Sequence, residues 1–124
     1  MIGIGIDIIE TERLRASMEG HGKAFLSHVF TEEEQAKAPS HEKARLDYYA
    51  GRWAAKEAVA KALGTGFGPE CAWLDLHIEN LPSGQPVVVL TGTAAATAAR
   101  LGIRAIHISI SHDVHYAVAQ AIAE

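Results

Sequence analysis

The segment from Glu42 to Leu63 constrains the fold of this chain more than any other part of the sequence. Its apolar residues recur at the spacing of one helical face, and it ends at Gly64-Thr65-Gly66, a pattern typical of a helix C-terminus. Several side chains of the segment are small, which permits close packing on a sheet: Ala54, Ala55, Ala58, Val59 and Ala62. The pattern therefore predicts one long helix packed on a sheet.

The N-terminal segment, residues 2–9, alternates in the manner of a strand. One face carries four isoleucines, Ile2, Ile4, Ile6 and Ile8. The opposite face carries Gly3, Gly5, Asp7 and Ile9. Because two glycines share a face with Asp7, we expect room for a bulky group beside this carboxylate.

The remaining segments predict an α+β fold, with a largely antiparallel sheet packed on one long helix. Alternation or short apolar runs predict strands at 74–78, 87–90, 106–111 and 116–122, and the first two form a hairpin around the turn at 80–86. Shorter helices are expected at 11–19, from 31 and at 93–101. Gly20 would end the first, and Thr31 with Glu34 would form a capping box for the second.

Length and composition restrict the class of protein. The 124 residues suffice for one domain, 1–124, and 48% of them are hydrophobic, as in ordinary globular proteins. No apolar run is long enough for a transmembrane helix, and Asp7 comes too early for a signal peptide. The lone Cys71 favours a reducing compartment, so we expect a cytoplasmic protein. A net charge of −4 argues against nucleic acid as a partner.

Asp7 is the first candidate for chemistry. A carboxylate inside an isoleucine-glycine strand is costly to bury unless it is paired or binds a cation. It could equally cap the following helix or pair with an arginine, and the strand pattern alone leaves these alternatives open.

Glu57 and Lys61 are the second candidate, because they are four residues apart and share a helix face. In an ordinary helix they would form an exposed ion pair of little consequence. Here the surroundings are almost entirely alanine, so Asp7 from a strand and Glu57 from the covering helix could jointly hold a hard cation such as Mg²⁺. Lys61, one turn further on, would then balance phosphate charge.

The strand at 106–111 supplies a third set, because its His107, Ser109 and Ser111 share one face. This face is equally consistent with the solvent side of an edge strand. His112 and His115 have a spacing that hints at zinc, but no second cluster of ligands accompanies them. A serine–histidine nucleophile pair would lack the usual nucleophile elbow.

Taken together, these segments resemble the holo-[acyl-carrier-protein] synthase family of phosphopantetheinyl transferases. The matching motifs stand in the family's order and cover nearly the whole chain. They are Gly5-Ile6-Asp7-Ile8-Ile9-Glu10 with Arg13, Phe30-Thr31 with Glu34, Gly51-Arg52-Trp53-Ala54-Ala55-Lys56-Glu57-Ala58 continuing through Lys61 to Gly66, Gly84-Gln85-Pro86, and His107-Ile108-Ser109-Ile110-Ser111-His112. The long-helix motif is the most specific of these.

The resemblance implies a Mg²⁺-dependent transfer of 4′-phosphopantetheine from coenzyme A to a serine of apo acyl carrier protein, in support of fatty acid biosynthesis. Asp7 and Glu57 would bind Mg²⁺, Lys61 would hold the phosphates, and Glu57 is the candidate base. The active site would lie between subunits of a trimer. Contacts to the nucleotide end of coenzyme A would come from Lys43, Arg52 and His107, and from the turn Gly84-Gln85-Pro86 of a neighbouring subunit.

The first helix resembles the surface on which this family docks its acidic carrier protein, here through Arg13, Met18 and Lys23. An apolar ridge of Leu14 and Met18 would suit an acidic amphipathic helix. Gln85 departs from the family pattern, because a lysine is common there. Residues 19–23 also carry less positive charge than in many relatives, so carrier affinity is expected to be lower or tuned to one partner.

Two other functions are compatible with the same residues. A Mg²⁺-dependent hydrolase of coenzyme A or nucleotide pyrophosphate would use the same carboxylates, but it would not need a basic docking helix. A non-catalytic coenzyme A-binding module would not need Asp7 and Glu57 together. The long, ordered set of motifs favours the transferase.

Overall fold

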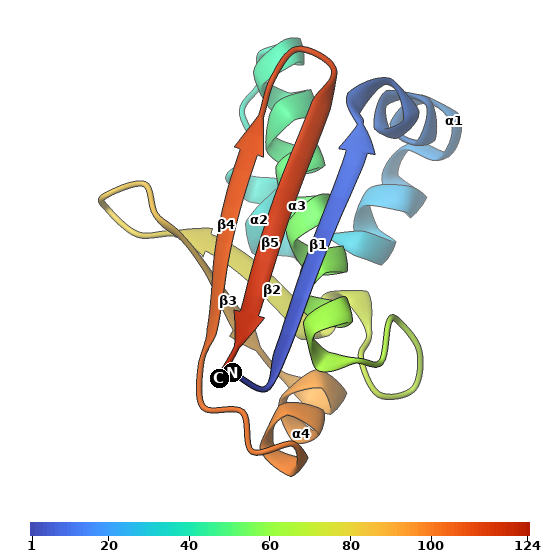
Figure 1. Ribbon diagram of the computed structural model, residues 1–124. Coiled ribbons are helices and arrows are strands. Elements are labelled where there is room, and N and C mark those ends of the chain that lie inside the picture. Colours follow the sequence, from blue (N-terminus) through green and yellow to red (C-terminus); the bar gives the residue numbers. More distant parts are fainter.

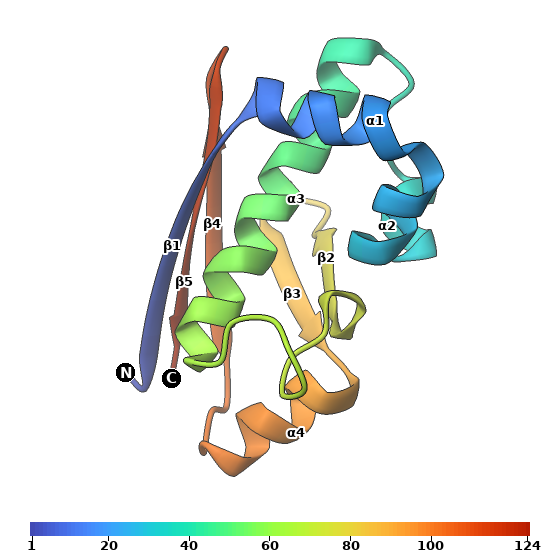
Figure 2. The same cartoon turned by 90° about the vertical axis from the view of Figure 1, so that its right-hand side faces the viewer.

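Helix α3 (Glu42–Leu63) lies at the centre of the computed structural model, which describes residues 1–124 (Figure 1). It has the predicted bounds, and it ends where Gly64 adopts a left-handed backbone conformation with φ 80°. Figure 2 shows α3 between a three-stranded sheet and a two-stranded hairpin. Small buried side chains such as Ala54, Ala55 and Ala58 allow this approach from both sides.

The three-stranded sheet has the order β1-β5-β4 and is antiparallel throughout. It consists of β1 (Gly3–Glu10), β5 (Tyr116–Ala123) and β4 (Ile106–His112). Asp7 lies opposite Ala119, which in turn lies opposite Ile110. The strand order therefore places Asp7 on one edge strand of the sheet and Ser111 and His112 of β4 on the other.

Two glycines of β1 face the backbone of α3. A Cβ added to Gly3 would overlap the carbonyl oxygen of Ala62, and one added to Gly5 would overlap that of Ala58. The expected room for a ligand beside Asp7 is therefore wrong, because the helix itself fills it. The glycines instead bring Asp7 close to the side chains of α3.

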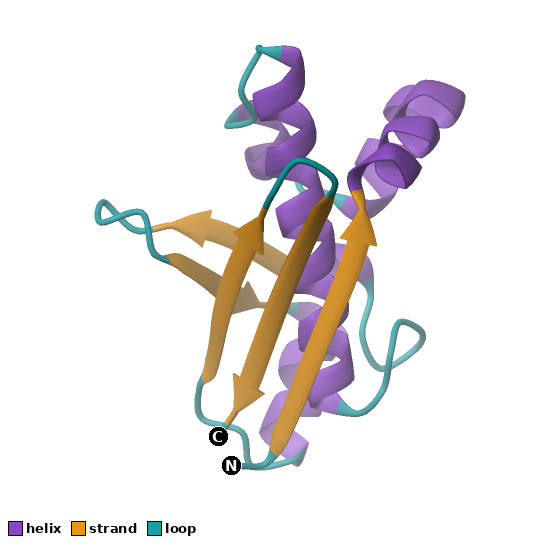
Figure 3. Ribbon diagram, turned by 45° about the horizontal axis from the view of Figure 1, so that its top comes forward, coloured by secondary structure: helices purple, strands orange, loops and turns teal.

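The isoleucine face of β1 has no other element over it (Figure 3). The side chains of Ile2, Ile4, Ile6 and Ile8 are between 49% and 63% exposed. Four exposed isoleucines in a row form an apolar patch of the kind that marks an interaction surface.

Helix α1 (Thr11–Val29) is longer than the sequence predicted. It passes through Gly20 and bends at Gly22, whose φ of 51° and ψ of −128° are not helical. Leu14 is 1% exposed and packs in a second hydrophobic cluster with Phe30 and Tyr49. The predicted surface ridge of Leu14 and Met18 is therefore wrong, because Leu14 belongs to the core.

A fully buried ion pair joins α2 (Glu32–Ala36) to α3. Thr31 and Glu34 form the predicted capping box, which leaves Glu34 oxygens facing the interior. Lys56 Nζ donates to Glu34 Oε1 at 2.7 Å and to the carbonyl oxygens of Val29 and Trp73 at 2.7 Å and 3.4 Å. Glu34 Oε2 accepts the backbone N–H of Ile78. Every proton of this ammonium therefore has an acceptor, and the pair links five elements of the fold.

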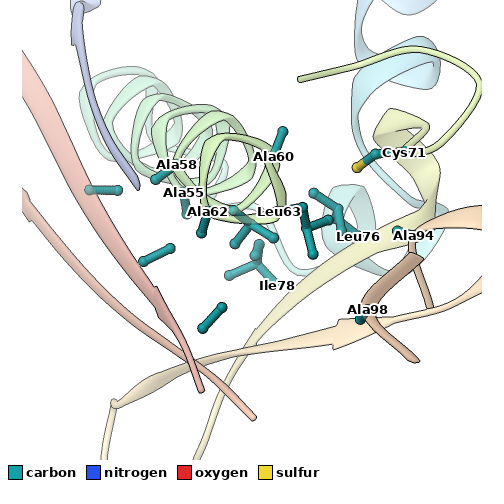
Figure 4. Packing of buried hydrophobic residues seen from close by; sticks show 14 of the residues in the cluster. Ala55, Ala58, Ala60, Ala62, Leu63, Cys71, Leu76, Ile78, Ala94 and Ala98 are labelled. Atoms are coloured by element: carbon teal, nitrogen blue, oxygen red, sulfur yellow. The ribbon is translucent and has the colours of Figure 1, made fainter. Parts of the chain in front are cut away.

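The hairpin consists of β2 (Leu76–Asn80) and β3 (Pro86–Leu90), close to its predicted bounds. Leu74 was expected in its first strand but lies in a 3-10 turn, η1 (Trp73–Asp75). Helix α4 (Gly92–Arg100) follows, and Figure 4 shows its Ala94 and Ala98 in the core with Leu76 and Ile78. None of the helices combines the length and the apolarity needed to cross a bilayer.

Candidate active site

Asp7 and Lys61 meet where β1 crosses the C-terminal half of α3. Lys61 Nζ donates to Asp7 Oδ1 at 3.1 Å and to the carbonyl oxygen of Ile6 at 2.9 Å. The Asp7 side chain is 16% exposed, whereas that of Lys61 is 50% exposed. Of the alternatives for Asp7, neither a cap for α1 nor an arginine partner is present, because its partner is a lysine.

Glu57 lies one turn before Lys61 on α3, but the lysine makes its ion pair with Asp7 instead. Partial burial raises the pKa of the Glu57 carboxyl above its ordinary value of 4.5, and the negative charge of Asp7 raises it further. The positive charge of Lys61 opposes this shift without cancelling it. The two carboxylates are therefore close enough to repel each other, and only one of them has a counter-ion.

This donor set fits a hard divalent cation. Two carboxylates that repel each other gain from a shared positive charge, and Glu57 has no paired cation in the chain. No group of three or more His, Cys, Asp or Glu side chains gathers anywhere in the chain as a closed metal site. A cation here would take its other ligands from water and substrate, which is the coordination that Mg²⁺ favours.

The three residues predicted to dock the carrier protein are not brought into one pocket. Arg13 lines a pocket of about 220 Å³ together with Asp7 and Trp53. Met18 and Lys23 line a separate groove of about 360 Å³ between α1 and α3. Arg13 is therefore nearer to the candidate active site than the other two.

A larger pocket, of about 450 Å³, lies at the β4 edge of the sheet. It brings together Arg52 from α3 with Gly84 and Pro86 from the hairpin turn of the same chain, whereas Gln85 is outside its lining. The resemblance implied that this turn would come from a neighbouring subunit, and that contact stays a prediction. Arg52 is 8% exposed and donates to Asn80 Oδ1 at 3.0 Å. Its Nε is buried without a partner. Such an unsatisfied donor is costly, and an anionic ligand would satisfy it.

Two further residues predicted to contact the nucleotide have protein partners. Lys43 Nζ pairs at 2.6 Å with Asp47, whose carboxylate lines the same pocket as Arg52. His107 Nε2 lies 2.6 Å from Glu124 Oε2. Both are on the face of the sheet that carries the exposed isoleucines of β1, away from α3. Within one chain, His107 is therefore outside the Arg52 pocket, and its contact with a nucleotide stays a prediction.

Sequence reasoning assigned only Arg52, Gly84 and Pro86 of this pocket, and it missed polar residues that include Asp47, Tyr48, Asn80 and His112. The ring of Tyr48 stacks against the guanidinium of Arg52, whose Cζ lies 3.8 Å from the ring centre. His112 and Asn80 complete its polar lining. The four-residue spacing of Tyr48 and Arg52 on a helix could have indicated their contact, but nothing in the sequence relates either of them to His112 or Asn80.

Comparison with known proteins gives consistent matches over the whole chain. The family model of the 4′-phosphopantetheinyl transferase superfamily matches residues 3–119. A holo-[acyl-carrier-protein] synthase of Desulforudis audaxviator is 47% identical over 123 residues, which cover 99% of this chain and 92% of that protein.

Solved structures with a similar fold carry the same family name. The holo-[acyl-carrier-protein] synthase from Neisseria meningitidis has a TM-score of 0.92 and 31% identity, covering 100% of this chain and 98% of that one. The Helicobacter pylori holo-[acyl-carrier-protein] synthase in complex with coenzyme A has a TM-score of 0.87 and 29% identity, covering 98% and 99%. The predicted α+β fold is confirmed by these similarities.

Proposed function

This chain belongs to the 4′-phosphopantetheinyl transferase superfamily, and on that premise we propose that it transfers 4′-phosphopantetheine from coenzyme A to a serine of apo acyl carrier protein. The other product is adenosine 3′,5′-bisphosphate. The observation that carries the proposal is the convergence of Asp7, Glu57 and Lys61 at the crossing of β1 and α3. The relatives with the same fold are named for this reaction.

In this proposal, Asp7 and Glu57 would hold Mg²⁺. When bound there, the cation neutralises negative charge on the coenzyme A pyrophosphate, which is the main requirement of phosphoryl transfer. Lys61 contributes a further positive charge to the phosphates. The attacking serine must lose a proton, and Glu57 is the candidate base.

The two halves of the proposed site lie at opposite edges of one sheet. Asp7 belongs to edge strand β1, while the Arg52 pocket includes Ile110 and His112 of edge strand β4. A contact between the β1 edge of one subunit and the β4 edge of the next joins unlike surfaces, and such contacts form a ring where the rotation between subunits closes. We propose a ring of three subunits, the number that the resemblance to the family implies, with the exposed isoleucines at the β1 edge in its interface.

The carrier protein binds beside α1 in this proposal. Arg13 and Lys23 are exposed cations on that helix, and Arg13 also lines the pocket that contains Asp7. An acidic carrier held there would present its serine near the metal site. A role in fatty acid biosynthesis and a location in the cytoplasm follow from this activity as further predictions, and residues 1–124 would serve as one transferase domain.

Intact mass spectrometry of the carrier protein tests the proposal. The purified protein is incubated with apo acyl carrier protein, coenzyme A and Mg²⁺. We expect the carrier to gain the mass of one phosphopantetheine group, and to gain none when Mg²⁺ is chelated or in Glu57→Ala. Consumption of coenzyme A without modification of the carrier would indicate a hydrolase. Binding of coenzyme A without any reaction, repeated with a second carrier protein, would indicate a binding module.

A further inference from the structure

Lys61 is held by two oxygens of β1, one of which belongs to the proposed metal site. Its Nζ lies 2.9 Å from the Ile6 carbonyl oxygen and 3.1 Å from Asp7 Oδ1. Both contacts come from neighbouring residues of one strand, so the ammonium has a defined position at the end of Asp7. An ammonium and a divalent cation at the same carboxylate oxygen would repel each other strongly. Lys61 in this position therefore opposes metal binding by Asp7.

In the protein without metal or coenzyme A, the charges of Asp7 and Glu57 are not equally compensated. Lys61 balances the charge of Asp7, while Glu57 has no cation of its own and feels the charge of Asp7 as repulsion. The lysine thus partly replaces the metal ion in the free protein. Since half of the Lys61 side chain is exposed, it can leave this position without disturbing the core.

We propose that Lys61 occupies part of the metal site in the free protein and moves to the phosphates when coenzyme A binds, which couples metal binding to coenzyme A binding. This inference rests on the proposed function. The free protein binds a divalent metal weakly, because Lys61 competes for Asp7. Coenzyme A offers Lys61 a phosphate partner and frees the carboxylate. By linkage, the metal strengthens coenzyme A binding by the same factor.

Metal titration without turnover tests this coupling. Binding of Mn²⁺ is followed by electron paramagnetic resonance of the free ion, with and without coenzyme A and with no carrier protein. The variants are Lys61→Met and the matched control Lys37→Met, which removes an exposed lysine of α2's C-terminus that has no contact with Asp7. Circular dichroism confirms that each variant is folded.

Without coenzyme A, we expect Lys61→Met to bind Mn²⁺ about two- to fivefold more tightly than the wild type, as expected for loss of a half-exposed ion pair. The gain in Mn²⁺ affinity on adding coenzyme A should be smaller in Lys61→Met than in the wild type. Lys37→Met should match the wild type in both respects. If Lys61→Met acted only by removing a positive charge near the site, it would tighten Mn²⁺ binding by the same factor with and without coenzyme A.

Two results would overturn the proposal: Mn²⁺ affinity in Lys61→Met no tighter than in the wild type, or the same gain on adding coenzyme A in both proteins. Failure of the proposed function itself gives a different result. If Asp7→Asn leaves Mn²⁺ affinity at the wild-type value, the metal site is misassigned and the premise is lost, whatever Lys61→Met does.

Discussion

Lys56 and Glu57 are neighbours on helix α3, yet their charges have opposite environments. The Lys56 ammonium is fully buried and contacts three oxygen acceptors, including the carboxylate of Glu34. Glu57 is half-buried, has no paired cation and lies within the repulsion of Asp7. The first charge is fully satisfied by the protein and joins secondary-structure elements. The second is left unsatisfied, which is the condition of a group that binds or reacts.

The two charges are compensated by different partners. Lys56 obtains all of it from the folded chain, so its removal should affect stability. Glu57 would obtain it from a metal ion and a substrate, so its removal should affect activity and relieve the fold of an unfavourable interaction.

The largest expected effect is on the buried pair. Lys56→Met leaves the Glu34 carboxylate buried without its counter-ion, so we expect a loss of about 3–5 kcal/mol in the free energy of unfolding. Urea denaturation followed by circular dichroism measures it, with the exposed Lys37→Met as control. A loss close to that of the control would contradict the structural role of Lys56.

The double variant Glu34→Gln/Lys56→Met sharpens the same test. It removes both charges, so most of the lost stability should return, because replacing a buried pair by neutral groups is often close to neutral. If the double variant is as unstable as Lys56→Met, the buried carboxylate is not the source of the loss.

In contrast to Lys56→Met, Glu57→Gln should lower activity and leave stability unchanged or slightly improved. We expect turnover to fall on the order of 10²–10³-fold at saturating Mg²⁺, as for loss of one electrostatic group in an active site. The melting temperature should rise slightly at neutral pH. Because the pKa of Glu57 is raised in the folded state, its ionised form lowers stability above that pKa, and the penalty disappears as pH falls through it.

Turnover and thermal melting of the same samples check this prediction, with Glu32→Gln, an exposed glutamate of α2, as control. Near-normal turnover in Glu57→Gln would remove Glu57 from the active site. A fall in melting temperature would show that Glu57 stabilises the fold, as Lys56 does.

Asp75 is a satisfied charge near the surface, so its effect should be smaller. Partial burial raises the pKa of its carboxyl, but hydrogen bonds from the Thr93 hydroxyl and from the backbone N–H groups of Ala72 and Ala94 outweigh this and leave the pKa lowered. Asp75→Asn should cost roughly 1 kcal/mol at neutral pH, like the loss of a helix cap.

The pH dependence checks the sign of that effect. A lowered carboxyl pKa gives stability that is present above the unfolded value of 3.8 and is lost as pH falls through the folded pKa. The difference between wild type and Asp75→Asn should therefore shrink in acid. A difference that stays constant down to pH 2 would exclude the carboxylate charge as its source.

Local patterns in the sequence predicted most of the fold. The bounds of α3, the capping box of Thr31 and Glu34, and the hairpin around residues 80–86 agree with the structure. Each depends on neighbours in sequence, through helical periodicity, capping or turn chemistry. The end of α1 was misplaced because Gly20 tolerates helical backbone, and the bend falls at Gly22 instead.

The candidate site was predicted less completely. The sequence indicated Asp7, Glu57 and Lys61 as a group, but it paired Lys61 with phosphate and not with Asp7. It also combined Arg13 with Met18 and Lys23, which the structure places in separate pockets. These differences concern contacts across distant segments, for which no local pattern exists.

By itself, the sequence determined which side chains share a face of each helix or strand, because the helical and strand periods are set by backbone geometry. It therefore determined that Asp7 and the glycines lie together, and that Glu57 and Lys61 are one turn apart. Only the tertiary structure decided what each face meets. The glycines admit α3 and not a ligand, Lys56 meets Glu34, and Asp7 meets Lys61. The reason is that packing joins residues far apart in sequence, and the charge of each group is compensated by whichever distant partner the fold delivers.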